Sequence, residues 1–196
     1  MRIPNKVGTY NTKNYPIDAN ITTKVTTDDI FDANLYYALY PDLQKAIGLN
    51  VDKLKKHYLK YGIKEGRIAS YVFDPDYYYN KYADLQKAFG KNYTELYNHF
   101  LNNGIKESRQ AIKIFDAKYY LENNVDLKSA FNTDNGRAIK HFAKNGIMEF
   151  RKTSNEFNVI AYREKNPDLS KAFGNESKAY YKHYLMYGKN ENRQTV

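Results

Sequence analysis

Four histidines recur at a constant spacing of 42 residues, and imidazole is a side chain that binds metals or transfers protons near neutral pH. They are His57, His99, His141 and His183. A zinc site needs three or four ligands within about 2.0–2.3 Å of one ion, and side chains a whole repeat apart do not converge in that way. Each histidine also lies in the apolar stripe of the third helix expected in its repeat, one residue before an aromatic. We therefore predict four buried structural histidines and no metal site.

A buried imidazole needs a hydrogen-bond partner. Aspartates recur with the same period at the start of the second helix expected in each repeat: Asp42, Asp84, Asp126 and Asp168. We expect these carboxylates to pair with the histidines, with a backbone carbonyl as the alternative partner.

An arginine also recurs with this period, two residues after a glutamate. The arginines are Arg67, Arg109, Arg151 and Arg193. A row of guanidinium groups can bind phosphate or a sulfated glycan, whereas a structural arginine would hold an aspartate or a helix end at a junction between repeats. The arginine is present even in the last copy, which favours a structural role within each repeat.

Two groups of tyrosines stand out among the 21 in the chain. One group recurs at a single inward position and is predicted to be core: Tyr36, Tyr78, Tyr120 and Tyr162. The other does not recur regularly and is the candidate for contact with a glycan or a protein partner, because exposed tyrosine stacks on sugar rings and fills interfaces. It comprises Tyr37, Tyr61, Tyr79, Tyr93 and Tyr187.

The sequence has no unrepeated constellation of the kind that enzymes use. It contains no glycine-rich phosphate loop, no Gly-x-Ser-x-Gly motif, no unique pair of carboxylates and no cysteine. Each candidate group is one of several identical copies. We therefore predict a protein that is not an enzyme, with no catalytic residue and no cofactor.

The repeat that positions these side chains is 42 residues long and shows no insertion or deletion. Its copies open at Phe31, Phe73, Phe115 and Phe157. A fixed period of this length is typical of repeat arrays. We name the copies unit 1 to unit 4: residues 31–72, 73–114, 115–156 and 157–196, the last including a C-terminal cap.

Unit 1 predicts three helices. Asp32 is a suitable N-cap for the first, Pro41 suits the first position of the second, and Gly48 ends it. The third is expected over about 52–61, with Gly62 behind it in the left-handed conformation. We predict an all-α fold, an α-solenoid in which four units stack as one rod and each unit touches its neighbours.

Residues 1–30 lack the period and are rich in Asn, Thr, Lys and Asp. We expect an extended arm that takes no part in the core and becomes ordered on a protein partner. Its spaced apolar side chains are the expected anchors in that partner: Ile3, Tyr10, Tyr15, Ile17 and Ile21. Deletion of residues 1–30 is accordingly expected to leave the melting temperature nearly unchanged.

The net charge of +9 is spread along the chain. The arm carries +1 and the four units carry +3, +1, +1 and +3, which sums to +9, and carboxylates are interleaved throughout. Nucleic-acid binding proteins instead cluster their lysines and arginines on one face. The distribution therefore favours a solvated basic surface over a nucleic-acid interface.

No apolar run approaches the roughly 20 residues that a membrane-spanning helix needs. The start of the chain, Met-Arg-Ile-Pro-Asn-Lys, lacks the apolar core of a secretory signal. We expect no membrane partner, and either synthesis without a leader or a leader that has been removed.

The pattern Phe-Asp-x-x-Tyr-Tyr, then Pro-Asp-Leu-x-x-Ala-Phe-Gly, then His-Tyr/Phe-Leu-x-x-Gly-Ile-x-Glu-x-Arg recurs along the chain with substitutions. Over residues 31–193 this pattern resembles a tandem repeat of bacterial secreted and surface proteins, found there beside adhesive or carbohydrate-related modules. It is also similar to repeats in some phage structural proteins. Departures are mild: Ala83 and Val125 stand in place of proline, and Asn132 in place of glycine. The resemblance implies display on a surface and no particular reaction.

Three functions follow as hypotheses. The leading one is a non-catalytic structural and interaction protein, a virion fibre or decoration protein attached through its arm to capsid or other assembly subunits, with homo-oligomerisation left open. The second is a carbohydrate-binding or adhesion module of a bacterial surface. The third is a basic nucleic-acid-binding repeat protein. Because no signal peptide is visible, the virion fits better than a secreted adhesin, and the expected location is the virion or the cell surface.

Overall fold

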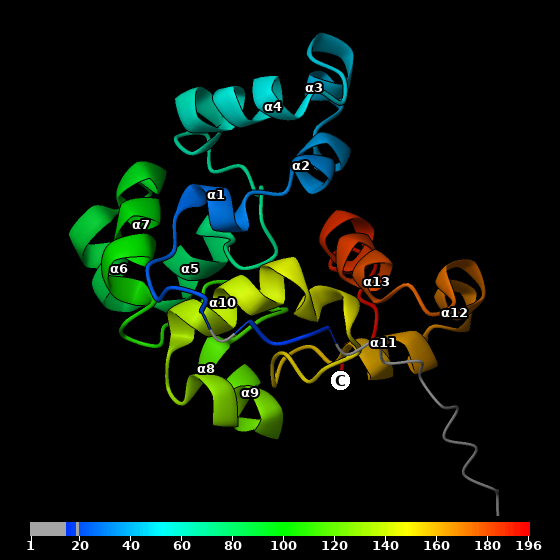
Figure 1. Ribbon diagram of the computed structural model, residues 1–196. Coiled ribbons are helices and arrows are strands. Elements are labelled where there is room, and N and C mark those ends of the chain that lie inside the picture. The colour runs from blue at the N-terminus through cyan, green and yellow to red at the C-terminus, as the bar shows by residue number, and fades with distance from the viewer. Residues whose placement is uncertain (1–14, 19) are drawn as a thin grey trace, which may run out of the picture.

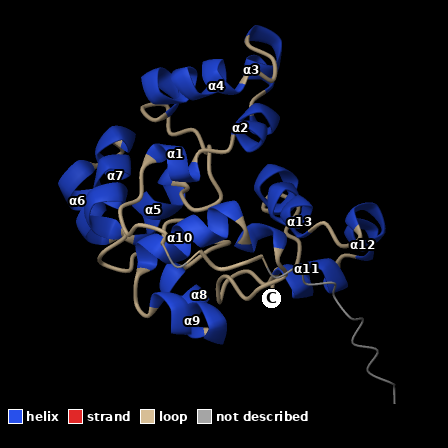
Figure 2. Cartoon of the chain, in the orientation of Figure 1, coloured by secondary structure: helices blue, strands red, loops and turns tan. Residues whose placement is uncertain are grey.

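Figure 1 shows the computed structural model of the chain, in which residues 15–18 and 20–196 are described. Within these residues the regular structure consists of 13 α-helices and four short helical turns, with no strand (Figure 2). One isolated antiparallel bridge joins Ile112 and Phe115. The prediction of an all-α fold is confirmed. None of the described helices is long and apolar enough to cross a lipid bilayer.

Each unit contributes three short α-helices and a tight helical turn. Unit 1 has α2 (Ala33–Leu39), α3 (Pro41–Ala46), α4 (Val51–His57) and a π-helical turn, Tyr58–Gly62. Unit 2 has α5 (Pro75–Lys81), α6 (Ala83–Phe89), α7 (Tyr93–His99) and the π turn Phe100–Gly104. Unit 3 has α8 (Ala117–Glu122), α9 (Val125–Phe131), α10 (Asn135–Lys144) and a 3₁₀ turn, Gly146–Met148. Unit 4 has α11 (Val159–Lys165), α12 (Pro167–Phe173), α13 (Ser177–His183) and the π turn Tyr184–Gly188.

Local sequence signals account for most helix ends. The Asp32 carboxylate accepts a hydrogen bond from the Leu35 N–H at 2.7 Å, which confirms it as the N-cap of α2. Pro41 opens α3, and Gly48 lies just beyond it at φ 69°, a conformation that costs glycine little. In unit 3 the equivalent position is Asn132 at φ 55°, because asparagine also tolerates the left-handed region.

The prediction of a left-handed Gly62 is wrong. Positive φ occurs four residues later, at Gly66 (φ 68°), and at the equivalent Ser108 (φ 56°) and Asn192 (φ 51°). Gly62 instead completes the π turn, where the backbone needs space for a buried side chain rather than an unusual dihedral angle.

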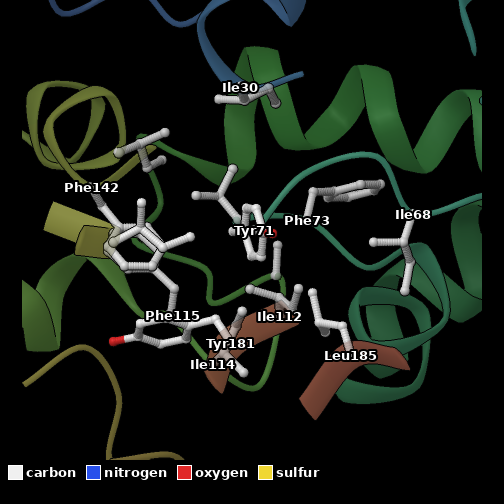
Figure 3. Close-up of a cluster of buried hydrophobic side chains, with 14 of the residues drawn as sticks. Ile30, Ile68, Tyr71, Phe73, Ile112, Ile114, Phe115, Phe142, Tyr181 and Leu185 are labelled. Carbon is white, nitrogen blue, oxygen red and sulfur yellow. The ribbon is translucent and has the colours of Figure 1, made fainter. Parts of the chain in front are cut away.

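The core lies where the connecting segments between units meet. Figure 3 shows side chains from the connectors packed with others from α1, α10, α13 and the turn after α13, in one buried cluster. The labelled members are Ile30, Ile68, Tyr71, Phe73, Ile112, Ile114, Phe115, Phe142, Tyr181 and Leu185. All of them are less than one-tenth exposed. We call this cluster the hub. It draws side chains from all four units.

The expectation that units touch only their neighbours is wrong. The Lys178 ammonium of unit 4 lies 2.6 Å from the Asp32 carboxylate of unit 1, with two units between them in the sequence. Lys189 lies 4.0 Å from Asp74 of unit 2. The connectors are apolar and bury their side chains together in the hub, so the chain curls until unit 4 meets units 1 and 2.

The expectation that residues 1–30 stay outside the core is also wrong for the described part. Residues 20–30, which we call the strap, cross units 2 and 3 and end in α1 (Thr27–Ile30). Val25 and Ile30 are 5% and 4% exposed and belong to the core. The Thr23 hydroxyl donates to Asp134 at 2.6 Å. A β-carbon at Gly136 would overlap the Thr23 carbonyl oxygen, so this glycine is what lets the strap lie against α10.

Some of the residues expected to anchor the arm in a partner instead contact their own chain. Ile17 and Ile21 are half-buried against the core of their own chain, and the Tyr15 N–H donates to the Glu149 carboxylate at 2.7 Å. Ile3 and Tyr10 lie outside the described residues. The segment available for a partner is therefore shorter than residues 1–30.

Candidate functional site

The repeated histidines pair with the repeated tyrosines. The tyrosine hydroxyl and histidine Nδ1 are 2.9 Å apart for Tyr36–His57 and Tyr78–His99, and 3.0 Å for Tyr120–His141 and Tyr162–His183. All four tyrosines are fully buried, as predicted. The prediction of an aspartate partner is wrong, because each of those aspartates is held by an arginine.

A glycine completes each Tyr–His pair. The tyrosine hydroxyl faces a glycine that ends the π turn in units 1, 2 and 4 and begins the 3₁₀ turn in unit 3: Gly62, Gly104, Gly188 and Gly146. At each of them a β-carbon would overlap that hydroxyl oxygen. A residue larger than glycine would therefore displace the ring or break its hydrogen bond. The tyrosine, histidine and glycine of each unit form one packed group, which we call the Tyr–His–Gly cluster.

The repeated arginines bridge two carboxylates of their own unit. Arg67 Nη1 donates to Asp42 at 3.0 Å, and Arg67 Nε donates to Glu65 at 2.6 Å. The same bridge recurs as Arg109 with Asp84 and Glu107, Arg151 with Asp126 and Glu149, and Arg193 with Asp168 and Glu191. The hydrogen bond from each arginine lowers the pKa of its aspartate. Each arginine thus forms ion pairs within its own unit, as a structural role requires, and its guanidinium group already holds carboxylates where a phosphate ladder would need it free.

Unit 3 is the most enclosed of the four. His141 and Glu149 are fully buried, whereas the glutamate side chains of the other three bridges are 40–43% exposed. Tyr15, just before the strap, supplies the additional cover through its N–H bond to Glu149. Burial lowers the pKa of His141 below its ordinary value of 6.5, and His141 Nε2 has no hydrogen-bond partner in the described part of the chain.

The candidate surface tyrosines differ in exposure. Tyr61 and Tyr187 are 36% and 51% exposed, while Tyr37, Tyr79 and Tyr93 are half-buried. The two exposed rings occupy one repeat position, since 187−61 equals three periods of 42, and the two positions between them are Asn103 and Asn145. This regularity was visible in the sequence and was missed, because two of the four copies are not tyrosine.

The exposed rings lie beside histidines and cations. Tyr61 packs at 5.2 Å from the His57 ring, and Lys60 and Lys64 lie about 5 Å from its centroid. Tyr187 packs in the same way at 5.5 Å from His183. A ring with one open face and neighbouring donors is the arrangement that stacks on a sugar or a protein side chain.

The described residues contain no cluster of three or more His, Cys, Asp or Glu side chains that could hold a metal ion. No protein-family model matches this chain, and neither does any of the curated proteins or solved structures with which it was compared.

Replacement of His141 by alanine should lower the free energy of unfolding by about 1–3 kcal/mol, because it leaves a void and an unpaired Tyr120 hydroxyl. His57→Ala is the matched control, since His57 is half-exposed and its loss should cost less. Urea denaturation measures both. Equal losses, or a rise in melting temperature on addition of zinc to the wild type, would contradict a structural His141.

Acidification below about pH 6.5 should weaken the wild type through His141. The unfolded chain binds a proton at His141 near pH 6.5 and the folded chain only at lower pH, so stability is full above 6.5 and falls as the pH drops below it. In His141→Gln this contribution is absent. The difference in free energy of unfolding between wild type and His141→Gln should therefore become smaller from pH 7.5 to pH 5.5. A difference that stays constant would contradict a lowered pKa of His141 in the folded chain.

Proposed function

We propose that this chain is a non-catalytic structural and interaction protein, a fibre or decoration protein of a virion that is displayed on the surface and attached through its N-terminal residues. In this proposal the units form a short α-solenoid curled around the hub. The proposal is supported by the repeated polar side chains that could have formed a reactive or ligand-binding site, because they are already bonded to other side chains of their own unit. Each Tyr–His–Gly cluster is closed by its own unit, and each arginine already holds two carboxylates.

One observation supports attachment to a partner through the N-terminal residues. Tyr15 is held at Glu149, and from there the strap is bound along units 2 and 3. Residues upstream of Tyr15 would therefore extend from a fixed point on the array. A binding segment that starts from a fixed point loses less orientational freedom on docking than one tethered by a long linker.

Co-purification with particles tests this proposal. We expect the chain in purified virions of its source, and we expect Ile3→Ser with Tyr10→Ser to prevent its incorporation without changing its melting temperature. Tyr61→Ser, on the array, is the matched control and should incorporate normally. Normal incorporation of the Ile3/Tyr10 variant, or absence of the chain from particles, would contradict the proposal.

A second candidate function is carbohydrate binding, favoured by the equivalent exposed positions of Tyr61 and Tyr187. Each would stack on one sugar ring, with the neighbouring lysines directed at acidic substituents. Glycan-array binding that disappears in Tyr61→Ala with Tyr187→Ala, and persists in the half-buried control Tyr79→Ala, would support it. An array without reproducible signal would exclude it.

A further inference from the structure

Unit 3 differs from the other units in how its repeated histidine and glutamate meet solvent. His141 and Glu149 are both 0% exposed. The equivalent histidines of the other three units are half-buried, and the equivalent glutamate side chains are 40–43% exposed. A difference at one copy of a repeated position indicates a contact that this unit alone makes.

That contact is with residues 15–18, which we call the latch. The Tyr15 N–H donates to the Glu149 carboxylate at 2.7 Å, and the Tyr15 hydroxyl lies 3.8 Å from the Met148 sulfur. Ile17 packs against the core. From the latch the chain continues into the strap, which runs past α10, the helix that carries His141 (Figure 1). The latch is therefore bound beside the Tyr–His–Gly cluster of unit 3.

The ionisable groups around the His141 ring belong to unit 3 itself. They are Tyr120 of α8, Asp126 of α9, and Glu149 and Arg151 after the 3₁₀ turn. Burial has the largest effect and lowers the pKa of His141; Arg151 acts in the same direction, while Glu149 and Asp126 oppose it. Arg151 holds both carboxylates in ion pairs. These charges remain beside His141 whether or not the latch is bound, so the effect of the latch on the ring is its contribution to burial.

A proton on His141 conflicts with a bound latch. An imidazolium ring carries a proton on both nitrogens, but His141 Nε2 is buried and has no hydrogen-bond partner in the described part of the chain. A buried charged donor without an acceptor is costly. Departure of the latch would let water reach the ring, as it reaches the half-buried histidines, and would reduce this cost. Proton binding and latch binding therefore oppose each other, and by linkage each weakens the other by the same factor.

We propose that the latch is closed on unit 3 at neutral pH and that protonation of His141 in acid releases it. The latch is held fully above about pH 6.5, the ordinary range of histidine, and is weakened as the pH falls below it. Release would free residues 15–18 and lengthen the N-terminal segment that can reach a partner. The inference thus deepens the proposed function, on which its biological use rests, because the latch lies at the base of the attachment segment.

Titration of the histidine rings by NMR tests the linkage on the purified chain. Deletion of residues 2–18 should raise the pKa of His141 toward its ordinary value of 6.5 and should not change how the other three histidines titrate. Deletion of residues 2–13 is the matched control, because Tyr15 then remains an internal residue with its backbone N–H, and His141 should titrate as in the full chain. Both deletions keep the strap. An unchanged His141 after deletion of residues 2–18 would overturn the proposal, since the 3₁₀ turn of unit 3 would then account for the burial.

Hydrogen exchange at the Tyr15 amide tests the release itself. Its protection, corrected for the intrinsic pH dependence of exchange, should fall by about fivefold or more from pH 7.5 to pH 5.5, a typical coupling between linked sites. In His141→Gln the protection should not change over this range. The same loss in His141→Gln would overturn the proposal, because a carboxylate such as Glu149 would then be the titrating group, and so would constant protection in the wild type. Both measurements use the purified chain, so the latch can fail while virion attachment holds, and the reverse.

Discussion

Gly146→Ala should lower the free energy of unfolding by about 2–5 kcal/mol, although it adds a single methyl group. The new β-carbon would overlap the Tyr120 hydroxyl, and Tyr120 is fully buried between Phe115, Phe142 and His141. The ring cannot retreat without breaking its hydrogen bond to His141. Urea denaturation gives the value.

Two further variants make this result specific. Gly90→Asn introduces a larger side chain where nothing lies within 4 Å, and the equivalent residue in unit 3 is already Asn132, so its cost should be small. Tyr120→Phe removes the overlapping oxygen. Gly146→Ala should therefore cost less in a Tyr120→Phe background than in the wild type, in a double-mutant cycle. Additive effects would show that the glycine is needed for another reason.

Removal of residues 1–30 should also lower the free energy of unfolding. The lost apolar burial of Val25 and Ile30 alone accounts for about 3–6 kcal/mol. The deletion also removes the Thr27 hydroxyl that Tyr97 bonds at 2.9 Å. This expectation replaces the one from the sequence, in which residues 1–30 contribute nothing to stability. Thermal melting of the truncated chain measures it.

Gly136→Ala tests the same contact without removing any residue. Its β-carbon would meet the Thr23 carbonyl oxygen, so the strap must lift from α10 and the melting temperature should fall. Deletion of residues 1–14 is the control, because the strap contacts described above all begin at or after Tyr15. If a chain that starts at residue 31 has the same melting temperature as the full chain, the claim that the strap belongs to the core is contradicted.

The features predicted correctly from the sequence are local. The all-α class follows from helical spacing, and the N-cap at Asp32, the start of α3 at Pro41 and the end at Gly48 follow from the conformational preferences of single residues. The intra-unit role of the arginines followed from their presence in the last copy. Each inference needed only one unit.

The features that were missed depend on contacts between distant positions. Tyr36 and His57 are 21 residues apart, and the 42-residue period shows that both recur without showing that they touch. Gly62 was assigned to a helix cap because caps are the commonest reason for glycine there, whereas close approach of a buried hydroxyl is a second reason that a one-dimensional pattern does not reveal. The strap contains too few apolar residues for its burial to be predicted from the sequence. Gly136, in the helix that the strap contacts, is the sequence feature that is explained by this contact.

The shared hub is tested most directly by native-state hydrogen exchange followed by mass spectrometry. If the connectors pack in one core, the slow amides of residues 68–73, 110–115 and 150–157 should exchange with a single free energy, and Leu185→Ala in unit 4 should lower that free energy in all three segments together. In a linear array with contacts between neighbours alone, Leu185→Ala would affect unit 4 and the end of unit 3 and leave residues 68–73 unchanged. That second pattern would contradict the hub.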